Sequence, residues 1–491
     1  MKKTPDKYLG PKGYSIRKDC LSIEEQIDLR NDLTVKAFIP KNSMQKARPF
    51  PVFRESKNKF YLPKFYGVKR FGPTVHETIS EGDDIDLKFK GELRPYQKPI
   101  VDTYIKKAHE IGGGLLEVAV GFGKTICTLN IISKLNKKTL IVVHKEFLLR
   151  QWVERIEEFL PGARVGRIQG EIMDIKDKDI VIGMLQSLSM KDYPSNVFNS
   201  FGLTAIDEVH HMGAEVFSRA LFKIVTKNML GLSATMKRSD NLSKVFKMFI
   251  GPIVYTKRRE GGDGVVVQVI DYENKDKEFS QVELNWKGQV HYSKMIKKIC
   301  EFNPRSEFIL NVLEKMLKDK LCNQIMILGH NKVLLKYLHD AIEHRKMASV
   351  GYYVGGMKEK DLKISETKKV VIATYAMASE GLDIKTLSTL IMATPKSSVE
   401  QCIGRILRIK HKRPLVVDIV DQHEFFNRQW IKRKRFYAKE KYKIKRTNNK
   451  SYFKNEWLTL FDGKRMKAYN EKKANELLNG KCLIQPDSDS D

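Results

Sequence analysis

Cysteine is scarce in this sequence of 491 residues, which contains only six: Cys20, Cys127, Cys300, Cys322, Cys402 and Cys482. They lie far apart and form no CxxC pair, which argues against a zinc site or a disulfide framework and is typical of reduced thiols. Long apolar runs are also missing, since the longest are short stretches such as LIVV at 140–143, whereas a membrane span needs about 18 residues. The N-terminus carries lysines but no apolar stretch, so we expect no secretory signal, no membrane association and an intracellular location.

Negative charge is in short supply as well. Asp and Glu total 59 against 89 Lys and Arg, which gives a formal net charge of +30. Such an excess favours a polyanionic partner, and nucleic acid is the first expectation. The hydrophobic share of 42% is large enough for packed cores, so a wholly disordered chain is excluded.

Short apolar runs alternate with helix-compatible stretches in two parts of the chain. The runs in the first part are 115–120, 139–144, 179–185, 203–207 and 229–235, and those in the second part are 324–330, 368–377, 387–395 and 414–421. Stretches such as 146–160 place apolar residues at helical spacing between them. This rhythm predicts two tandem α/β domains, each a doubly wound parallel sheet covered by helices.

The two ends of the chain differ from its middle. Residues 1–90 carry 19 basic and 12 acidic side chains, with an aromatic and proline-rich stretch, and we expect a small β-containing appendage. Residues 425–491 carry 18 basic and 8 acidic side chains. Within them, 431–446 is helix-compatible and interleaves basic residues with Phe436, Tyr437 and Tyr442, which fits a surface that binds phosphates and stacks bases, or a solvated helix. The predicted domains are 1–90, 91–255 with the ATP site, 256–424 with the linker and second domain, and 425–491 as a basic C-terminal extension.

GFGKT at 121–125 follows an apolar run and precedes a helix-compatible stretch, as a phosphate-binding loop requires. Gly121 and Gly123 allow the backbone to turn its amides inward, Lys124 supplies charge for phosphates, and Thr125 offers a hydroxyl to Mg²⁺. Val118 stands where the strict pattern has its first glycine. The motif predicts a nucleotide site, with a plain strand-to-helix turn as the alternative.

DEVH at 207–210 ends another apolar run, so its carboxylates are expected at the carboxyl edge of a sheet, where ligands bind in α/β folds. Asp207 is the predicted Mg²⁺ ligand, and Glu208 is the predicted base that orients and deprotonates the attacking water. A solvated acidic turn is the alternative, which the phosphate loop upstream disfavours.

Six motifs follow one another in a fixed order: LRPYQ (93–97), GFGKT (121–125), DEVH (207–210), SAT (233–235), EGLD (380–383) and QCIGRILR (401–408). This order resembles a superfamily 2 helicase of the DExH type and covers about two thirds of the chain. LRPYQ and the leucine-rich LLRQW at 148–152 resemble the XPB-like, UvsW-like and poxvirus transcript-release branch. The resemblance implies two tandem RecA-like domains with small appendages, and a large DNA virus or phage as the source. The host cytoplasm, a viral factory and the virion are then the expected locations.

The resemblance also implies roles for individual residues. The ATP-binding set would be Gln97, Arg94, Gly121, Phe122, Gly123, Lys124, Thr125, Gly381 and Asp383, with Gln97 reading the adenine edge. A coupling set of Ser233, Thr235 and His210 would relay the nucleotide state, and His210 would pair with Gln401. Arg405 and Arg408 would share one helix face and reach the γ-phosphate from the second domain as arginine fingers.

Nucleic-acid contacts are implied for polar residues near the ends of strands: Arg150, Gln151, Gln186, Ser187, Thr374 and Ser379. Glu380 stands where many RNA helicases carry arginine, which favours DNA. We therefore predict a monomeric, ATP- and Mg²⁺-dependent helicase or translocase on DNA, acting on duplexes, branched DNA or transcription and recombination complexes. An RNA helicase is one alternative, and a non-enzymatic basic binding or packaging protein is another.

Overall fold

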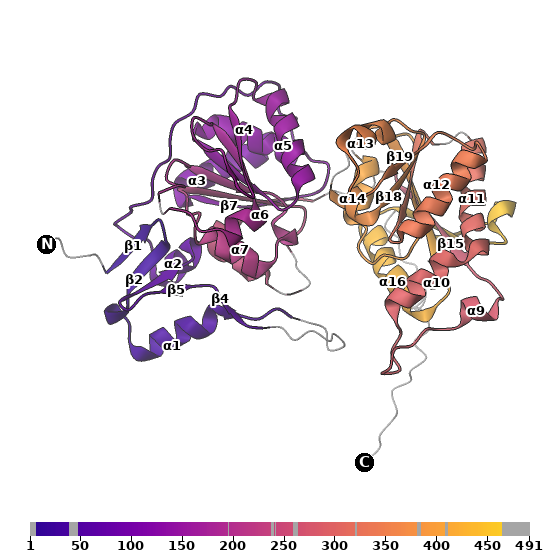
Figure 1. Cartoon of the computed structure of the whole chain (residues 1–491), viewed down its shortest axis with the longest axis horizontal. Coiled ribbons are helices and arrows are strands. Elements are labelled where there is room, and N and C mark those ends of the chain that lie inside the picture. The colour runs from indigo at the N-terminus through magenta and orange to yellow at the C-terminus, as the bar shows by residue number, and fades with distance from the viewer. Residues whose placement is uncertain are drawn as a thin grey trace, which may run out of the picture. The chain divides into compact units, whose positions relative to one another are not determined.

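The computed structural model describes residues 6–38, 48–194, 196–236, 240, 242–258, 264–319, 322–380, 384–407 and 411–463. The chain divides into two compact units, Met1–Arg258 and Arg259–Asp491, and each is described here by itself (Figure 1). In the described residues, no helix is both long and apolar enough to cross a membrane.

A small N-terminal module opens the first unit. Its antiparallel sheet has the order β1 (Lys7–Gly10), β2 (Gly13–Arg17), β6 (Lys59–Leu62) and β5 (Arg54–Glu55). The short strands β3 (Thr34–Val35) and β4 (Phe50–Pro51) pair separately, and the helices are α1 (Ile23–Asp32) and α2 (Lys64–Phe71). Helix α1 begins with a capping box, in which Ser22 Oγ accepts the Glu25 N–H and the Glu25 carboxylate accepts the Ser22 N–H. The β-containing appendage expected from the sequence is therefore present.

The large sheet of the first unit has eight strands in the order β10-β9-β11-β8-β12-β13-β7-β14, and every neighbouring pair is parallel except β10 with β9. The strands are β7 (Gly113–Val118), β8 (Thr139–Val143), β9 (Val165–Gln169), β10 (Ile172–Met173), β11 (Ile180–Met184), β12 (Leu203–Ile206), β13 (Asn228–Ser233) and β14 (Ile253–Lys257). The helices are α3 (Lys98–Ile111), α4 (Lys124–Leu135), α5 (Glu146–Phe159), α6 (Leu185–Met190), α7 (Ala214–Leu221) and α8 (Ser243–Ile250).

Both faces of this sheet are buried, which explains why its strands are continuous apolar runs. Along β8, Leu140 and Val142 belong to the core that contains α6, α7 and α8. Ile141 and Val143 point the opposite way, into the core that contains α3, α4 and α5. The five strands predicted from apolar runs in this part of the chain are confirmed.

The second unit repeats the architecture, with strand order β17-β18-β16-β19-β20-β15-β21-β22. The strands are β15 (Val266–Tyr272), β16 (Gln324–Gly329), β17 (Val350–Tyr353), β18 (Val370–Thr374), β19 (Leu387–Met392), β20 (Leu415–Asp421), β21 (Lys443–Asn448) and β22 (Leu458–Phe461). The helices are α9 (Lys277–Ser280), α10 (Tyr292–Glu301), α11 (Asn303–Lys318), α12 (Lys332–His344), α13 (Glu359–Glu366), α14 (Tyr375–Glu380), α15 (Glu400–Ile403) and α16 (Glu424–Lys439). Two RecA-like α/β domains in tandem are thus confirmed.

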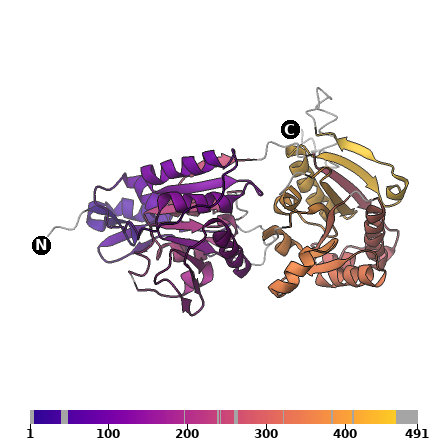
Figure 2. The same cartoon turned by 90° about the horizontal axis from the view of Figure 1, so that it is seen from above.

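The basic segment 431–446 differs from its predicted form. Helix α16 ends at Lys439, and Lys441 adopts a left-handed backbone with φ of 57°. The chain then forms β21 beside β15, and β22 pairs antiparallel with β21 at the edge of the sheet, in yellow in Figure 2. Tyr437 and Tyr442 are buried in the core of the unit, so they are not a base-stacking surface.

Arg433 of the same segment is buried because it neutralises an internal charge. Its guanidinium donates to both carboxylate oxygens of Asp418 on β20, at 2.8 and 2.9 Å, and the Tyr437 hydroxyl donates to the same carboxylate. Basic residues in this sequence therefore do not all face solvent. The described part of the C-terminal segment therefore belongs to the second unit, where α16, β21 and β22 contribute to its core and its sheet.

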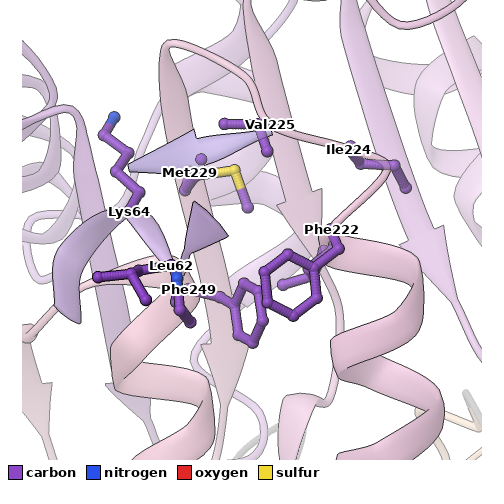
Figure 3. A pocket seen from close by; sticks show the side chains of 10 residues that line it. Leu62, Lys64, Phe222, Ile224, Val225, Met229 and Phe249 are labelled. Atoms are coloured by element: carbon purple, nitrogen blue, oxygen red, sulfur yellow. The ribbon is translucent and has the colours of Figure 1, made fainter. Parts of the chain in front are cut away.

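The N-terminal module meets the large sheet of the first unit around a small cavity (Figure 3). Leu62 and Lys64 line it from the module, whereas Phe222, Met229 and Phe249 line it from the domain. Lys64 extends away from the two phenylalanines, and its ammonium donates to the Lys227 carbonyl at 2.8 Å. Burial lowers the pKa of Lys64 from its ordinary 10.5 to about 8.

This buried ammonium predicts a pH-dependent stability. Between the folded pKa of about 8 and the unfolded value of 10.5, the unfolded chain binds more protons, so stability rises with pH across this interval. Relative to Lys64→Met, wild type should gain about 2 kcal/mol of unfolding free energy from pH 7.5 to pH 9.5. Denaturant unfolding of both proteins at each pH measures this gain. Lys69→Met, which removes an exposed lysine of α2, is the control, and a stability difference between wild type and Lys64→Met that does not change with pH would contradict the prediction.

Candidate nucleotide-binding site

Three predicted motifs meet at one edge of the first large sheet. Strands β12, β13 and β7 are adjacent and parallel, so their carboxyl ends lie together. DEVH follows β12, SAT includes the last residue of β13, and the phosphate loop follows β7. The structure thus brings together motifs that are up to about 110 residues apart in the sequence, at the edge where α/β sheets bind ligands.

The phosphate loop has the backbone that its glycines predict. Gly121 and Gly123 have φ of 87° and 78°, and α4 begins directly afterwards at Lys124. The free N–H groups of the first turn of α4 therefore border the loop, as an anion-binding helix terminus requires. Thr125 is half-buried on this turn. Val118, at the position of the missing glycine, is the last residue of β7 and is buried in the core, so this position serves packing.

Lys124 and Glu208 form an ion pair across the two motifs. The Lys124 ammonium lies 2.9 Å from Glu208 Oε1, and the side chains are only 12% and 18% exposed. Lysine at this place supplies charge to phosphates, and a carboxylate beside it can orient water. The ion pair means that the two predicted catalytic groups neutralise each other's charge.

Asp207, the residue before Glu208 in the chain, is buried. Its Oδ2 accepts a hydrogen bond from the Trp152 indole N–H at 3.0 Å. Burial, together with the charge of Glu208, raises the pKa of Asp207 to about 6. Trp152 was not predicted as a site residue. Its position on the apolar face of α5, in the LLRQW segment, indicated only a core residue, and nothing in the sequence revealed which carboxylate its N–H would reach.

Glu208 has an unusual backbone. Its φ of 47° and ψ of 52° lie in the left-handed region, which a non-glycine residue adopts at a cost and mostly at functional sites. Because of this turn, its carboxylate has Lys124 at one oxygen and His210 Nδ1 at 3.3 Å from the other.

The predicted coupling residues are in contact. Ser233 Oγ lies 2.7 Å from His210 Nδ1 and accepts the Thr235 N–H at 3.2 Å. A chain of polar contacts therefore runs from Glu208 through His210 to the end of β13. The predicted pairing of His210 with Gln401 stays a prediction, since Gln401 lies on α15 of the other unit.

Gln97 forms a hydrogen bond with the backbone of the phosphate loop. Its Oε1 accepts the Arg94 N–H at 2.9 Å, and its Nε2 donates to the Phe122 carbonyl at 3.0 Å. Arg94 donates to the Tyr96 hydroxyl, and the Tyr96 ring packs edge-on against Phe122 at 5.2 Å. The residues predicted to bind adenine therefore form one group with the loop. The adenine contact itself stays a prediction.

The donors fit the predicted Mg²⁺ site. Thr125 offers a hydroxyl and Asp207 a carboxylate, and Mg²⁺ is usually held by one or two such groups together with phosphates and water. Among the described residues, no group of three or more His, Cys, Asp or Glu side chains could hold a metal by itself. An all-protein metal cage is therefore not found in the part of the chain that the structure describes.

In the second unit, Arg405 lies on a short 3-10 turn, Gly404–Leu407, rather than on the predicted continuous helix. It is largely buried, and its guanidinium donates to the carbonyls of Ala378 and Ser379. The QCIGRILR segment therefore breaks after α15, which ends at Ile403. Three predicted residues, Gly381, Asp383 and Arg408, lie outside the described residues, and the arginine-finger role stays a prediction.

The predicted nucleic-acid contacts stay predictions, and the structure gives their local partners. Arg150 forms an ion pair with Glu146 on the exposed side of α5. Gln151, the next residue of the same helix, is half-buried. Gln186 donates to the His144 carbonyl at 3.1 Å, and Ser187 accepts the Gly170 N–H. Thr374 accepts the Met377 N–H, and Ser379 donates to the Tyr375 carbonyl at 2.6 Å.

Comparisons with known proteins identify the family of the chain. The family described as "Type III restriction enzyme, res subunit" matches residues 90–238, which include the phosphate loop, DEVH and SAT. A protein of Acanthamoeba polyphaga mimivirus, named as an ATP-dependent RNA helicase, is 35% identical over 88% of this chain and 85% of its own length. A protein of Invertebrate iridescent virus 6, named as a helicase, is 28% identical over 72% of this chain and 83% of its own length. The crystal structure of T4 UvsW is similar over 87% of this chain and 96% of that one, at 18% identity and a TM-score of 0.33. With its motif order and the mimivirus relative together, the chain belongs to the superfamily 2 helicases of large DNA viruses.

Proposed function

We propose that the chain hydrolyses ATP to move along nucleic acid, and that its track is DNA. The observation that carries the hydrolysis is the Lys124–Glu208 ion pair, which joins the phosphate loop to the DEVH motif next to the buried Asp207. The DNA track is supported by Glu380, which stands where many RNA helicases carry arginine, and by the resemblance of LRPYQ to XPB-like translocases.

The residues divide the work by position. The first-turn amides of α4 and the Lys124 ammonium would hold the phosphates. Lys124 would then give up its ion pair with Glu208 and contact the nucleotide instead. Glu208, released from that pair, would accept a proton from the attacking water. Thr125 and Asp207 would hold Mg²⁺, which when bound neutralises phosphate charge. Trp152 keeps the Asp207 carboxylate oriented through its N–H.

An RNA track is the second candidate, and the name of the mimivirus relative favours it. We also propose a monomeric motor that serves transcription or recombination complexes, and a location in the host cytoplasm or a viral factory. These assignments rest on the family resemblance and on the net charge of +30.

ATP turnover with different polymers tests the track. Wild type is assayed alone and with single-stranded DNA, duplex DNA, forked DNA and single-stranded RNA, at equal nucleotide concentration and fixed salt. The proposal predicts stimulation by DNA that exceeds stimulation by RNA. Stimulation by RNA alone would establish the second candidate, and equal turnover with and without every polymer would refute a nucleic-acid motor.

A further inference from the structure

The N-terminal sheet has a second face opposite its apolar core. The core side is formed by Leu9, Tyr14, Ile16, Phe60 and Leu62. On the other side, the strand register pairs Tyr8 with Ser15 and Ser15 with Tyr61. Since paired residues share a face, these three side chains form a row across β1, β2 and β6.

A lysine covers each tyrosine ring of this row. The Lys59 ammonium lies 5.0 Å from the centre of the Tyr8 ring, and the Lys12 ammonium lies 5.1 Å from that of Tyr61. Neither lysine forms an ion pair with any residue that the structure describes. The neighbouring Arg17, in contrast, is neutralised by Asp19 and Asp6. The row therefore presents two aromatic rings and two uncompensated positive charges.

Ser15 adds a polar group in the middle of the row. It is only 1% exposed, and within the described parts of the chain its Oγ has no hydrogen-bond partner. A buried hydroxyl without a partner is costly, and such groups in native structures call for an explanation. A ligand atom that enters between the two rings would supply the missing partner.

We propose that this face binds single-stranded nucleic acid, with unpaired bases stacked on Tyr8 and Tyr61. Base stacking on aromatic side chains beside a cationic track is how proteins hold single strands. The two rings stand two strands apart, or roughly 10 Å, which is about three times the rise per nucleotide of a duplex strand. The spacing suits a splayed single strand rather than stacked base pairs.

The lysines would change partner when the strand binds. In the free protein, each ammonium rests over the face of a ring, where the negative face of the ring attracts it. A base that stacks on the ring takes this place, and the ammonium can then move to the adjoining phosphate. The two tyrosine rings and the two lysines therefore suit a strand that supplies both a flat base and a negatively charged phosphate.

This proposal goes beyond the ATP-driven motor, because binding at the N-terminal sheet requires no hydrolysis. The test is the equilibrium binding of a fluorescent 12-nucleotide oligothymidylate or oligouridylate to the full chain without ATP. Tyr8→Leu/Tyr61→Leu should weaken binding about tenfold or more. Lys12→Gln/Lys59→Gln should weaken it severalfold and flatten its salt dependence. Lys57→Gln, an exposed lysine of the same module, is the matched control and should leave binding within twofold.

Photo-crosslinking gives a second readout that needs no variant. An oligonucleotide with 5-iodouracil is cross-linked to wild type, and the attached peptides are identified by mass spectrometry. Attachment at Tyr8 or Tyr61 is expected, with DNA and RNA probes run in parallel to show which strand is held. Tyrosine and lysine variants that bind like the control, with cross-links confined to other parts of the chain, would overturn the proposal. Weaker binding in a chain that never turns over ATP would support it and refute only the motor.

Discussion

Glu208→Gln is expected to lower nucleic-acid-stimulated ATP hydrolysis about 100-fold or more, while ATP binding persists. Glutamine keeps the size of the side chain and can still accept a hydrogen bond from Lys124, but it cannot take a proton from water. Steady-state turnover and the binding of a fluorescent ATP analogue measure the two halves of the prediction.

The control lies in the same domain. Glu215→Gln changes an exposed glutamate of α7 that pairs with Arg219 on the protein surface, and turnover should stay within twofold. If Glu208→Gln retained a tenth or more of the wild-type rate, another group would have to be the base. If it also lost ATP binding, its effect would be structural.

The second large effect concerns the stability of the second unit. Arg433→Ala is expected to lower its unfolding free energy by about 3–5 kcal/mol, because the variant leaves the buried Asp418 carboxylate without its cation. The Tyr437 hydroxyl would remain its hydrogen-bond donor, which does not compensate a buried charge. Denaturant unfolding followed by tryptophan fluorescence measures the loss, since Trp430 lies on the same helix.

Arg428→Ala is the matched control for Arg433→Ala. Arg428 lies on the same helix and pairs with Glu424 at the surface, where both side chains are about three-quarters exposed or more, so the loss should be about 0.5 kcal/mol or less. Replacing both members of the buried pair, as Asp418→Leu/Arg433→Met, should recover most of the stability. Equal losses in Arg433→Ala and Arg428→Ala would show that the buried pair contributes nothing.

The sequence predicted those features that depend on residues close together in the chain, and it did not predict contacts between distant elements. Runs such as 139–144 revealed buried strands because a parallel sheet covered on both faces needs apolar residues at every position. The phosphate loop and DEVH were readable because their chemistry depends on short spacings. The contact between Trp152 and Asp207 joins residues from different elements, and no local pattern encodes it.

Strands rich in polar residues are the second kind of feature that could not be predicted from the sequence. Residues 443–448 read KIKRTN, and the first four of them belong to the stretch 431–446, whose pattern is helix-compatible. The strand exists because Ile444 and Tyr442 enter a core that includes Val267 and Val269 of β15, more than 170 positions earlier in the sequence. For the same reason, the burial of Arg433 depended on Asp418, whose role the sequence did not disclose.

The strand order of the second unit has a consequence for the growing chain. Strand β15 is the first strand of this sheet to be made, yet both of its neighbours, β20 and β21, are among the last three. Leu415 follows Tyr272 by 143 residues, which at ribosomal speeds of about 5–20 residues per second means roughly 7–30 s of synthesis. Throughout that interval an apolar strand has emerged with no partner on either side. Neighbouring nascent chains on one messenger would carry the same open strand at the same time, and mispairing between them competes with folding until Asn448 has been added.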